Sequence, residues 1–498
     1  MKRRAFVRST FAAALGAPLL GQQSLFRAIP QDPADVDAIT GDGEEITLKG
    51  KAIKDFGTRL RGRLLLAHDE GYDQARRILN PSFDKHPALI AQAAGTADVR
   101  AAVDFAREHG LLTAVKCGGH SFSGKSTCDG GLLIDLSPFR HVRVDPVARR
   151  ARVTGGSLLA GVDHEAMQYD LVTPMGTVSH TGVGGLVTGG GFGRVARRFG
   201  LAIDNLTSVD VVTADGQFRR ASNNENPDLF WGVRGGGGNF GIVTSFEFQL
   251  HPMQRQILGG SILYPISMAR EFLELYAEYS VEAPDDVTLD FLMVQPPGGA
   301  PGVVGVTVCY SGPASRADRV LAPIRGLGTP IVDDVQAMDY VALQRSGDID
   351  DPRARATYLK GGFIGEIATG LISALVEGME GHPARSTIVA IPQCGGAIGR
   401  VANDATAFPH RDASANLLGI VDWAFGDDPT EHIAYIRRYW ATLEPFTQGF
   451  YANDAGAEVT AEAVNANYRG NFSRLVRVKN EYDPTNLFRL NANVQPTV

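Results

Sequence analysis

Short apolar runs separated by glycines fill the first half of the chain. Val99, Val103 and Ala106 recur at the spacing of one helix face, which predicts a helix that begins near Thr96 and stops near Gly110. Strands are predicted at residues 111–115, 132–136, 149–153, 206–213 and 242–250. The order of these elements indicates short β-α-β units up to about residue 254.

The second half has a different pattern, with longer alternating runs and amphipathic helices. Strand-like alternation occurs at residues 257–264, 303–310 and 386–391, and helical periodicity at 266–280, 429–443 and 463–479. This mixture predicts an antiparallel sheet covered by helices and places the chain in the α+β class. We expect a first domain at residues 46–254, a substrate-binding domain at 255–450, and a C-terminal segment at 451–498 that returns to the first domain.

The first residues resemble an export signal. Three basic residues at positions 2–4 precede an apolar stretch at 11–20 that is too short to span a bilayer. The arrangement Arg3-Arg4-x-Phe6 is similar to a twin-arginine signal, although a general secretory signal or an uncleaved anchor also fits these residues. We predict a signal at residues 1–21, a polar linker at 22–45, and a mature protein without a membrane span that is periplasmic or secreted.

Size, charge and cysteine content narrow the class of protein. The 498 residues favour two or three lobes, and the net charge of −7 gives no general basic field, so nucleic acid is not an expected partner. The four cysteines form no CxxC pair and no zinc-like spacing, and we predict no metal site. The 58 glycines are clustered, which marks backbone that turns sharply or lies close to a ligand.

Three glycine clusters lie in the first domain. The first, at residues 116–124, follows a predicted strand and contains His120, and its small residues expose backbone N–H groups that suit a pyrophosphate. The second covers 182–193 and the third 234–241. Turns alone would explain one such cluster. Three in one domain, one of them with a histidine, favour a bound dinucleotide.

The third cluster satisfies the pattern GxGxxG through Gly236, Gly238 and Gly241. The dinucleotide-binding fingerprint needs a strand before this pattern and a helix after it, whereas residues 242–250 alternate as a strand. We therefore reject a Rossmann fold and expect a different kind of dinucleotide site.

With these clusters the chain resembles the berberine bridge enzyme-like branch of the vanillyl-alcohol oxidase flavoproteins. The resemblance runs from about Tyr72 to the C-terminus. It rests on Gly118-Gly119-His120-Ser121, Ile134-Asp135-Leu136-Ser137, Gly189-Gly190-Gly191-Phe192-Gly193, Arg234-Gly235-Gly236-Gly237-Gly238-Asn239-Phe240-Gly241 and Tyr482-Asp483-Pro484-x-Asn486-x-Phe488-Arg489. The resemblance implies a two-lobed FAD-binding domain of the PCMH type beside the substrate domain.

The same resemblance implies a set of cofactor contacts. His120 is expected to be bonded to the 8α carbon of the FAD isoalloxazine, the alternative being a histidine that lies beside a freely bound flavin. The other implied FAD-binding residues are Lys116, Cys117, Gly118, Gly119, Ser121, Phe122, Gly124, Gly182, Gly184, Gly185, Thr188, Gly189, Gly190, Gly193, Gly241, Ile242, Val243, Asn491 and Asn493.

Two positions depart from the family pattern. Val178 stands where many members carry a second, flavin-linked cysteine, so we expect a single covalent link. Leu186 stands where some bicovalent members have a histidine, and a leucine cannot donate a hydrogen bond to the flavin. Thr181 occupies the position with which the family tunes oxygen access, and its modest size favours an open path.

Oxidation by a flavin needs a base that takes a proton from the donor. Phe450-Tyr451-Ala452-Asn453 resembles the family's Tyr-x-Asn segment, whose tyrosine serves as that base. A free phenol has a pKa of about 10 and needs a stabilising partner, for which Lys360, His410 and Arg411 are the cationic candidates. The alternative for Tyr451 is an aromatic residue packed at a domain junction.

These features predict an FAD-dependent oxidoreductase that takes hydride from an alcohol, sugar, phenolic or amine donor and passes the electrons to O2, giving H2O2. A dehydrogenase with another acceptor and a flavin-binding protein with little turnover are the alternatives. A peptidoglycan-precursor reductase on the same FAD fold fits less well, because those enzymes bind flavin without a histidine link. No pattern in the sequence selects one donor.

Overall fold

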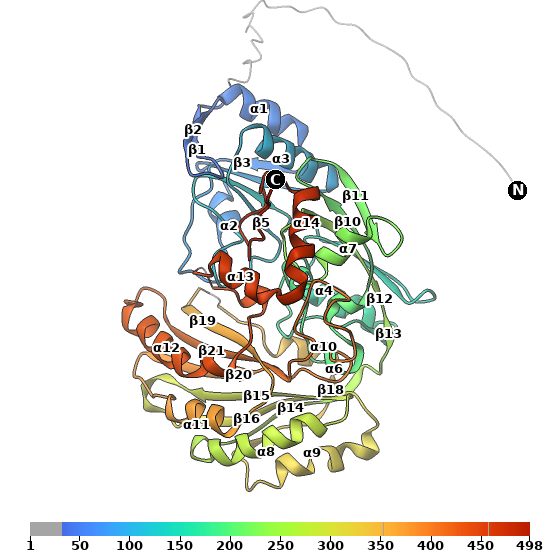
Figure 1. Cartoon of the computed structure of the whole chain (residues 1–498), viewed down its shortest axis with the longest axis vertical. Coiled ribbons are helices and arrows are strands. Elements are labelled where there is room, and N and C mark those ends of the chain that lie inside the picture. Colours follow the sequence, from blue (N-terminus) through green and yellow to red (C-terminus); the bar gives the residue numbers. More distant parts are fainter. Residues whose placement is uncertain (1–31, 352, 457) are drawn as a thin grey trace, which may run out of the picture.

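The computed structural model describes residues 32–351, 353–456 and 458–498, and the predicted export signal at 1–21 lies outside them. Figure 1 shows two domains, one above the other, with the C-terminal helices returning to the upper one. Helices combine with mainly antiparallel sheets in both domains, so the predicted α+β class is confirmed.

The first lobe of the upper domain has a mixed sheet. Its order is β3 (Arg63–Leu65), β4 (Leu89–Gln92), β6 (Leu132–Asp135) and β5 (Thr113–Lys116), with β4, β6 and β5 parallel. Helix α3 (Thr96–Glu108) precedes β5 and buries its apolar face on β6 and on the second lobe. Gly110, with a φ of 62°, follows the helix end as the sequence predicts.

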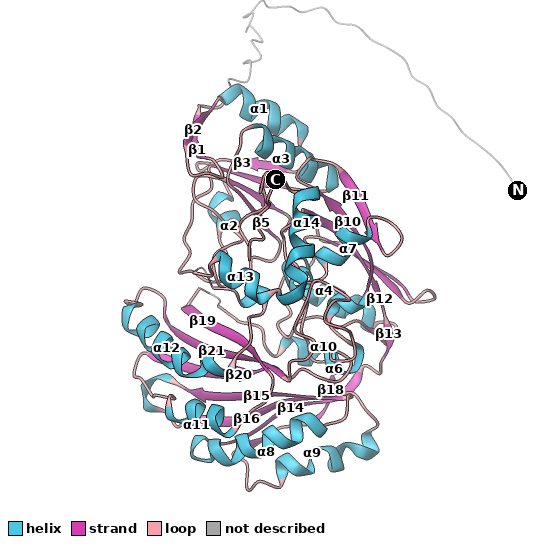
Figure 2. Cartoon of the chain, in the orientation of Figure 1, coloured by secondary structure: helices cyan, strands magenta, loops and turns pink. Residues whose placement is uncertain are grey.

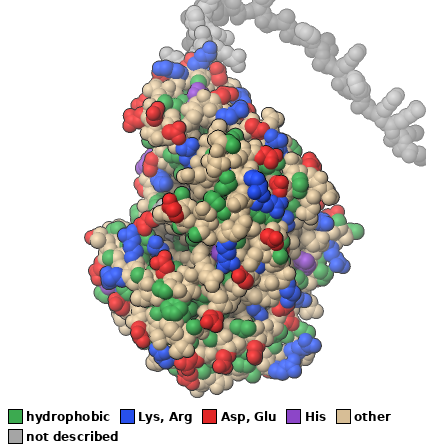
Figure 3. All heavy atoms as spheres, viewed as in Figure 1, with side chains coloured by type: hydrophobic (Ala, Val, Ile, Leu, Met, Phe, Trp, Pro, Cys, Tyr) green, Lys and Arg blue, Asp and Glu red, His purple; other side chains and the backbone are tan. Residues whose placement is uncertain are grey.

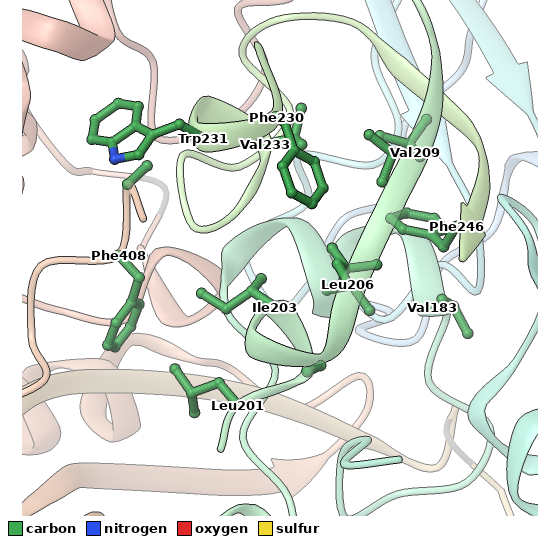
Figure 4. Packing of buried hydrophobic residues seen from close by; sticks show 14 of the residues in the cluster. Val183, Leu201, Ile203, Leu206, Val209, Phe230, Trp231, Val233, Phe246 and Phe408 are labelled. Carbon is green, nitrogen blue, oxygen red and sulfur yellow. The ribbon is translucent and has the colours of Figure 1, made fainter. Parts of the chain in front are cut away.

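The second lobe has an antiparallel sheet and a large shared core. The sheet order is β11 (Phe218–Ser222), β10 (Leu206–Val212), β12 (Ile242–Gln249), β8 (Arg150–Thr154) and β7 (Val142–Asp145). Phe408, which comes from the second half of the chain, belongs to the same buried cluster as Ile203 and Trp231, and the three lie in one region of Figure 4. This shared core joins the two domains.

The lower domain is built on one sheet, called the large sheet below. Its order is β17 (Val332–Asp333), β14 (Gln256–Pro265), β16 (Val303–Tyr310), β15 (Val287–Gln295), β20 (Arg385–Ile391), β21 (Ala415–Ala424) and β19 (Arg355–Ile364), and β18 (Gln336–Asp339) also pairs with β14. The helices α8 (Ala269–Glu282), α9 (Ala317–Arg325), α11 (Thr369–Glu377) and α12 (Thr430–Leu443) lie on the face turned away from the upper domain (Figure 2). The predicted sheet covered by helices is therefore confirmed.

A buried ion pair fixes the C-terminal segment to the upper domain. Helix α14 (Phe472–Tyr482) packs on α7 (Pro227–Val233) and carries Lys479. The Nζ of Lys479 lies 2.6 Å from the Asp483 carboxylate and donates to the carbonyls of Asn239, at 2.9 Å, and Phe488, at 3.0 Å. Because both charged side chains are fully buried, these contacts compensate their desolvation and tie the tail to the third glycine cluster.

Three segments differ from the prediction. Residues 36–39 of the expected linker form β1 (Val36–Ile39), which pairs with β2 (Glu45–Leu48) in a hairpin too short to show periodicity. The second glycine cluster contains a short helix, α5 (Val183–Gly189), which the burial of its valines stabilises despite its glycines. A 3₁₀ turn at Arg469–Asn471 interrupts the predicted tail helix and separates α13 (Ala461–Asn467) from α14.

The thiols, the surface charges and the helix lengths add three observations. The four cysteines are free in the described part of the chain. Acidic and basic side chains are interspersed over the face drawn in Figure 3. Among residues 32–351, 353–456 and 458–498, no helix has both the length and the apolar character needed to cross a bilayer.

Candidate active site

His120 lies in the first glycine loop, directly after β5. Its ring centroid is 5.1 Å from that of His180 and 5.4 Å from that of Phe122. Its Nε2 atom is buried and has no hydrogen-bond partner among the described residues. Burial, and next the neighbouring His180, lower the pKa of His120 to about 4. The imidazole is therefore neutral near pH 7 and has a nitrogen available to a ligand.

A carboxylate from the lower domain holds the loop beside His120. Asp348 accepts hydrogen bonds from the Ser179 amide at 2.7 Å and from the Ser179 hydroxyl at 2.6 Å. The Ile349 amide donates to Nε2 of His180 at 3.2 Å, so that nitrogen carries no proton. We call these contacts the Asp348 latch. No local sequence pattern predicts the latch, because Ser179 and Asp348 are 169 residues apart.

Tyr451 lies against the second glycine cluster. Its hydroxyl accepts hydrogen bonds from the Gly191 amide at 2.9 Å and from Nδ2 of Asn453 at 2.7 Å. Phe192 packs edge-on against its ring, with centroids 5.1 Å apart. Burial raises the pKa of the Tyr451 phenol well above its usual value, although the Gly191 hydrogen bond acts in the opposite direction. In this arrangement the phenol keeps its proton near pH 7.

The three cationic candidates have partners elsewhere. Lys360 lies 3.9 Å from Glu458, Arg411 makes two hydrogen bonds of 2.7 Å to Asp204, and Nε2 of His410 lies 3.0 Å from Oδ1 of Asn467. Burial, and next the charge of Arg469, lower the pKa of His410 to about 4, so its ring is neutral near pH 7. The Tyr451 hydroxyl accepts from its two neutral donors and donates to the Leu186 carbonyl at 3.4 Å, and no cation is among its partners in the described residues.

Close packing between loops explains part of the glycine pattern. A Cβ atom on Gly118 would lie 2.5 Å from the amide nitrogen of Gly182, so the first two clusters need glycine in order to contact each other. A Cβ atom on Gly185, in contrast, would meet nothing within 4 Å. The clusters therefore join the lobes and also leave open space beside the backbone of Gly185, within α5.

The other predicted cofactor residues fall in four places. The end of β5 and the first loop hold Lys116, Cys117, Gly119, Ser121, Phe122 and Gly124; α5 and the turn after it hold Gly184, Thr188, Gly189, Gly190 and Gly193; Gly241 precedes β12, which begins with Ile242 and Val243; and the C-terminal tail holds Asn491 and Asn493. Both tail asparagines have a buried side-chain oxygen without a partner in the described chain. A buried polar atom of this kind calls for a bound group or an ordered water as its partner.

A polar cavity of about 330 Å³ borders the first loop at Cys117 and Gly118. Its charged lining residues are Arg63, Arg77, Lys116, Asp135 and Arg140. The excess of positive charge suits an anionic group such as a pyrophosphate. The cavity, the unpartnered nitrogen of His120 and the asparagine oxygens are the features with which these residues would hold FAD.

A second polar pair is formed by Asn416 and by Asp454, which follows Tyr451 by three residues. The Nδ2 of Asn416, on β21, donates to Asp454 at 3.0 Å, and its Oδ1 is buried without a partner in the described residues. Burial raises the pKa of Asp454 to about 6, against the effect of that hydrogen bond. We did not predict either residue. The sequence feature that could have indicated Asp454 is its position directly after the Tyr-x-Asn segment, at a domain junction.

The fold and these residues define a two-domain flavoprotein, and comparisons with known proteins identify its family. Residues 87–222 match the FAD binding domain family and residues 447–495 match the berberine and berberine-like family. The chain belongs to the berberine bridge enzyme-like family of FAD-linked oxidoreductases. The resemblance predicted from the sequence is confirmed, and the protein is an enzyme that uses FAD.

Similar proteins include two oxidases. (R)-6-hydroxynicotine oxidase of Paenarthrobacter nicotinovorans is 31% identical, with 88% of this chain and 97% of that protein covered. Xylooligosaccharide oxidase of Thermothelomyces thermophilus is 30% identical, with 82% and 87% covered. The crystal structure of 6-hydroxy-D-nicotine oxidase from Arthrobacter nicotinovorans superimposes with a TM-score of 0.81 at 30% identity, covering 88% of this chain and 98% of that one.

Proposed function

We propose that this enzyme is an oxidase that holds FAD through one covalent bond to His120, takes hydride from a small-molecule donor, and passes the electrons to O2 with formation of H2O2. The observation that carries the proposal is the buried, neutral imidazole of His120, whose Nε2 has no partner in the described chain. The oxidases among the similar proteins support the use of oxygen.

A neutral imidazole suits covalent attachment. Attachment would join the unprotonated ring nitrogen of His120 to the 8α carbon of FAD, with loss of the proton from the other ring nitrogen and of one proton from the 8-methyl group. The two electrons would reduce the flavin, and O2 would reoxidise it. A protonated imidazole has no lone pair for this bond, so the lowered pKa keeps His120 reactive near pH 7.

A single link is the expected state. Val178 has no nucleophilic sulfur at the position where many relatives in the family carry a second linked residue. The nearby thiol of Cys117 points to the Ser157 carbonyl, 3.5 Å away, and burial raises its pKa to about 11. Because the thiolate is the reactive form, Cys117 is a poor candidate for a second bond.

The donor's proton needs an acceptor near the flavin. Bound FAD supplies a hydride acceptor at N5. Tyr451 is our proposed base, since two donated hydrogen bonds, from Gly191 and Asn453, would stabilise its phenolate once the proton has left. The raised pKa of Tyr451 disfavours its phenolate, and the bound donor and flavin must offset this effect.

Acid precipitation followed by absorbance of the pellet and the supernatant tests the proposal. We expect the flavin to remain with the pellet, one flavin-bearing peptide containing His120, and H2O2 when donor and air are present. Free FAD in the supernatant would contradict the covalent bond. Flavin reduction without peroxide would favour a dehydrogenase with another acceptor, and the modest size of Thr181 argues against that outcome.

Export is a further part of the proposal. The twin-arginine route carries folded proteins, which suits an enzyme whose cofactor is attached inside the cell. Replacing both Arg3 and Arg4 by lysine should leave the flavinylated enzyme in the cytoplasm, as measured by cell fractionation. Normal export of that variant would favour a general secretory signal instead.

A further inference from the structure

One face of the large sheet is apolar and only half-buried. Strand pairing aligns one row of side chains from β21, β20 and β15, made of Leu418, Ala390 and Leu292. A second row, two residues along the same strands, is made of Ile420, Ile388 and Val294. All six side chains are half-buried. We call these two rows the apolar wall.

The other face of the same strands is closed. Val389 and Met293, which alternate with the wall residues, are fully buried beneath the covering helices. Those helices lie on the side away from the upper domain, so the wall faces the domain that holds the flavin (Figure 2). The packing of β19 supports this orientation: Phe363, which pairs with Asn416, belongs to the buried cluster of the upper domain, whereas the next residue, Ile364, belongs to the cluster beneath the helices.

The flavin end of the wall is polar. Leu418 pairs with Gly361 on β19, where a Cβ atom would lie 3.5 Å from the Cβ of Asp454. Asn416 precedes Leu418 by two residues and therefore shares its face of the sheet. Asn416 is 3% exposed, yet its Oδ1 has no partner in the described residues. An unpartnered oxygen this deeply buried points to a group that binds there.

We propose that the apolar wall binds the reducing donor, and that the donor is a compact compound with an apolar ring whose single reacting hydroxyl or amine lies at Asp454 and Asn416. The proposal rests on the proposed function, because the wall is a substrate site only if the flavin beside it accepts hydride. Among the alcohol, sugar, phenolic and amine donors considered above, it excludes the sugars.

The chemistry of the wall distinguishes a ring compound from an oligosaccharide. Each sugar ring carries several hydroxyl groups, and each hydroxyl buried without a partner costs about 1–3 kcal/mol. The six wall side chains are aliphatic and offer no donor or acceptor. An apolar ring loses no hydrogen bond on the wall, and its one polar group meets the polar pair at the end.

The reaction at this site balances as a two-electron oxidation. The donor's C–H hydrogen leaves with both electrons to the flavin, its O–H or N–H proton passes to a base at the polar end, and a C=O or C=N bond forms. Asp454, Tyr451 and Asp290 are titratable groups at that end. Asp290 precedes Leu292 by two residues on β15 and accepts from the Gln393 amide at 3.0 Å, and burial raises its pKa. Lys360 of β19 pairs with Glu458 instead.

Anaerobic mixing of the intact holoenzyme with single donors tests the proposal through loss of flavin absorbance. Benzyl alcohol, 4-hydroxybenzyl alcohol and N-methylbenzylamine represent the ring class, and xylobiose and cellobiose represent the sugars. We expect at least one ring compound to reduce the flavin with a kcat/KM about 10-fold or more above either disaccharide. Faster reduction by a disaccharide would overturn the inference and leave the oxidase function intact.

A matched pair of variants tests the wall itself. Leu418→Asn places an amide among the aliphatic side chains, and we expect the KM for a ring donor to rise about 10-fold while flavin content is unchanged. Ile331→Asn is the matched control, because it replaces an aliphatic side chain of the same size that is 54% exposed. The KM of this variant should equal that of the wild type. Equal KM values in both variants would overturn the wall as the binding surface. A flavin that none of these donors reduces, alone or with oxygen present, would overturn both the inference and the proposed function.

Discussion

The carboxylate of Asp348 accepts two hydrogen bonds from Ser179, at 2.7 Å and 2.6 Å, and so joins the lower domain to the loop beside His120. The residue after Ser179 is His180, whose ring lies 5.1 Å from that of His120. The ring of His180 therefore lies between the latch and His120, the expected attachment site. Its contribution is to hold the loop in place rather than to take part in the reaction.

Loss of the latch should slow flavin attachment. Ser179→Ala removes the hydroxyl contact but leaves the amide contact, and Asp348→Asn replaces an acceptor-only group by an amide. A hydrogen bond to a charged group contributes about 1.5–3 kcal/mol, so we expect covalent incorporation of added FAD into the apoprotein to slow about 10-fold or more. In-gel flavin fluorescence against time measures the rate. Incorporation at the wild-type rate in both variants would show that the latch is only a domain contact.

The latch should also weaken in acid. Burial by itself raises the pKa of Asp348, but the hydrogen bonds from Ser179 outweigh it and the net pKa is lowered from 3.8. A carboxyl with a lowered folded pKa stabilises the fold above its unfolded pKa and loses this contribution as pH falls through the folded value. We expect the difference in unfolding free energy between wild type and Asp348→Asn to be constant above about pH 5 and to shrink below about pH 4.

Flavin attachment should depend on the protonation of His120. Its pKa of about 4 means that the reactive neutral imidazole predominates at pH 6 and is lost as pH falls through 4. The rate of covalent incorporation into apoprotein should be flat between about pH 5.5 and 7.5 and fall tenfold per unit below about pH 4. His120→Ala should bind FAD that acid precipitation releases. A rate that changes tenfold between pH 6 and pH 7 would contradict a depressed pKa.

The buried pair of Lys479 and Asp483 should dominate the stability of the C-terminal segment. Lys479→Met leaves the Asp483 carboxylate buried without its counter-ion, which costs about 3–5 kcal/mol. Arg477→Met, on the same helix but exposed, should change the unfolding free energy by about 0.5 kcal/mol or less. Urea titration followed by tryptophan fluorescence measures both. Equal stability of the two variants would mean that the methionine packs as well as the ion pair.

The sequence predicted what depends on local pattern and failed where distant residues meet. The helix at Thr96 and strands such as β10, β12, β14, β16 and β20 were predicted, because each has a regular apolar period that its burial requires. The strands β15, β19 and β21 of the large sheet were not predicted. The helix α5 was not, since its stability comes from the buried Val183 and Val187 and not from its glycines. The Asp348 latch and the Asn416–Asp454 pair depend on the relative placement of the two domains, which no local period encodes.

The identity of the base is the last testable point, and two groups compete for it. Tyr451 has the family's position but a raised pKa, whereas Asp454 has a pKa of about 6 and is mostly ionised at pH 7.5. Loss of a general base slows the chemical step about 10²–10⁴-fold. Stopped-flow flavin reduction in Tyr451→Phe and Asp454→Asn, each with confirmed flavin content, separates the two.

If Asp454 takes the proton, reduction of the wild-type flavin should slow as pH falls through about 6, because the carboxyl becomes protonated and cannot accept. Tyr451→Phe should keep that pH dependence, and Asp454→Asn should be slow and independent of pH over the same range. If Tyr451 takes the proton, the rate should instead rise toward high pH, and the phenylalanine variant should be the slow one. Asn453 donates to the Tyr451 hydroxyl at 2.7 Å and so stabilises its phenolate. If Tyr451 is the base, Asn453→Ala should therefore raise the pKa of the pH–rate profile. If Asp454 is the base, the same variant should leave that pKa unchanged.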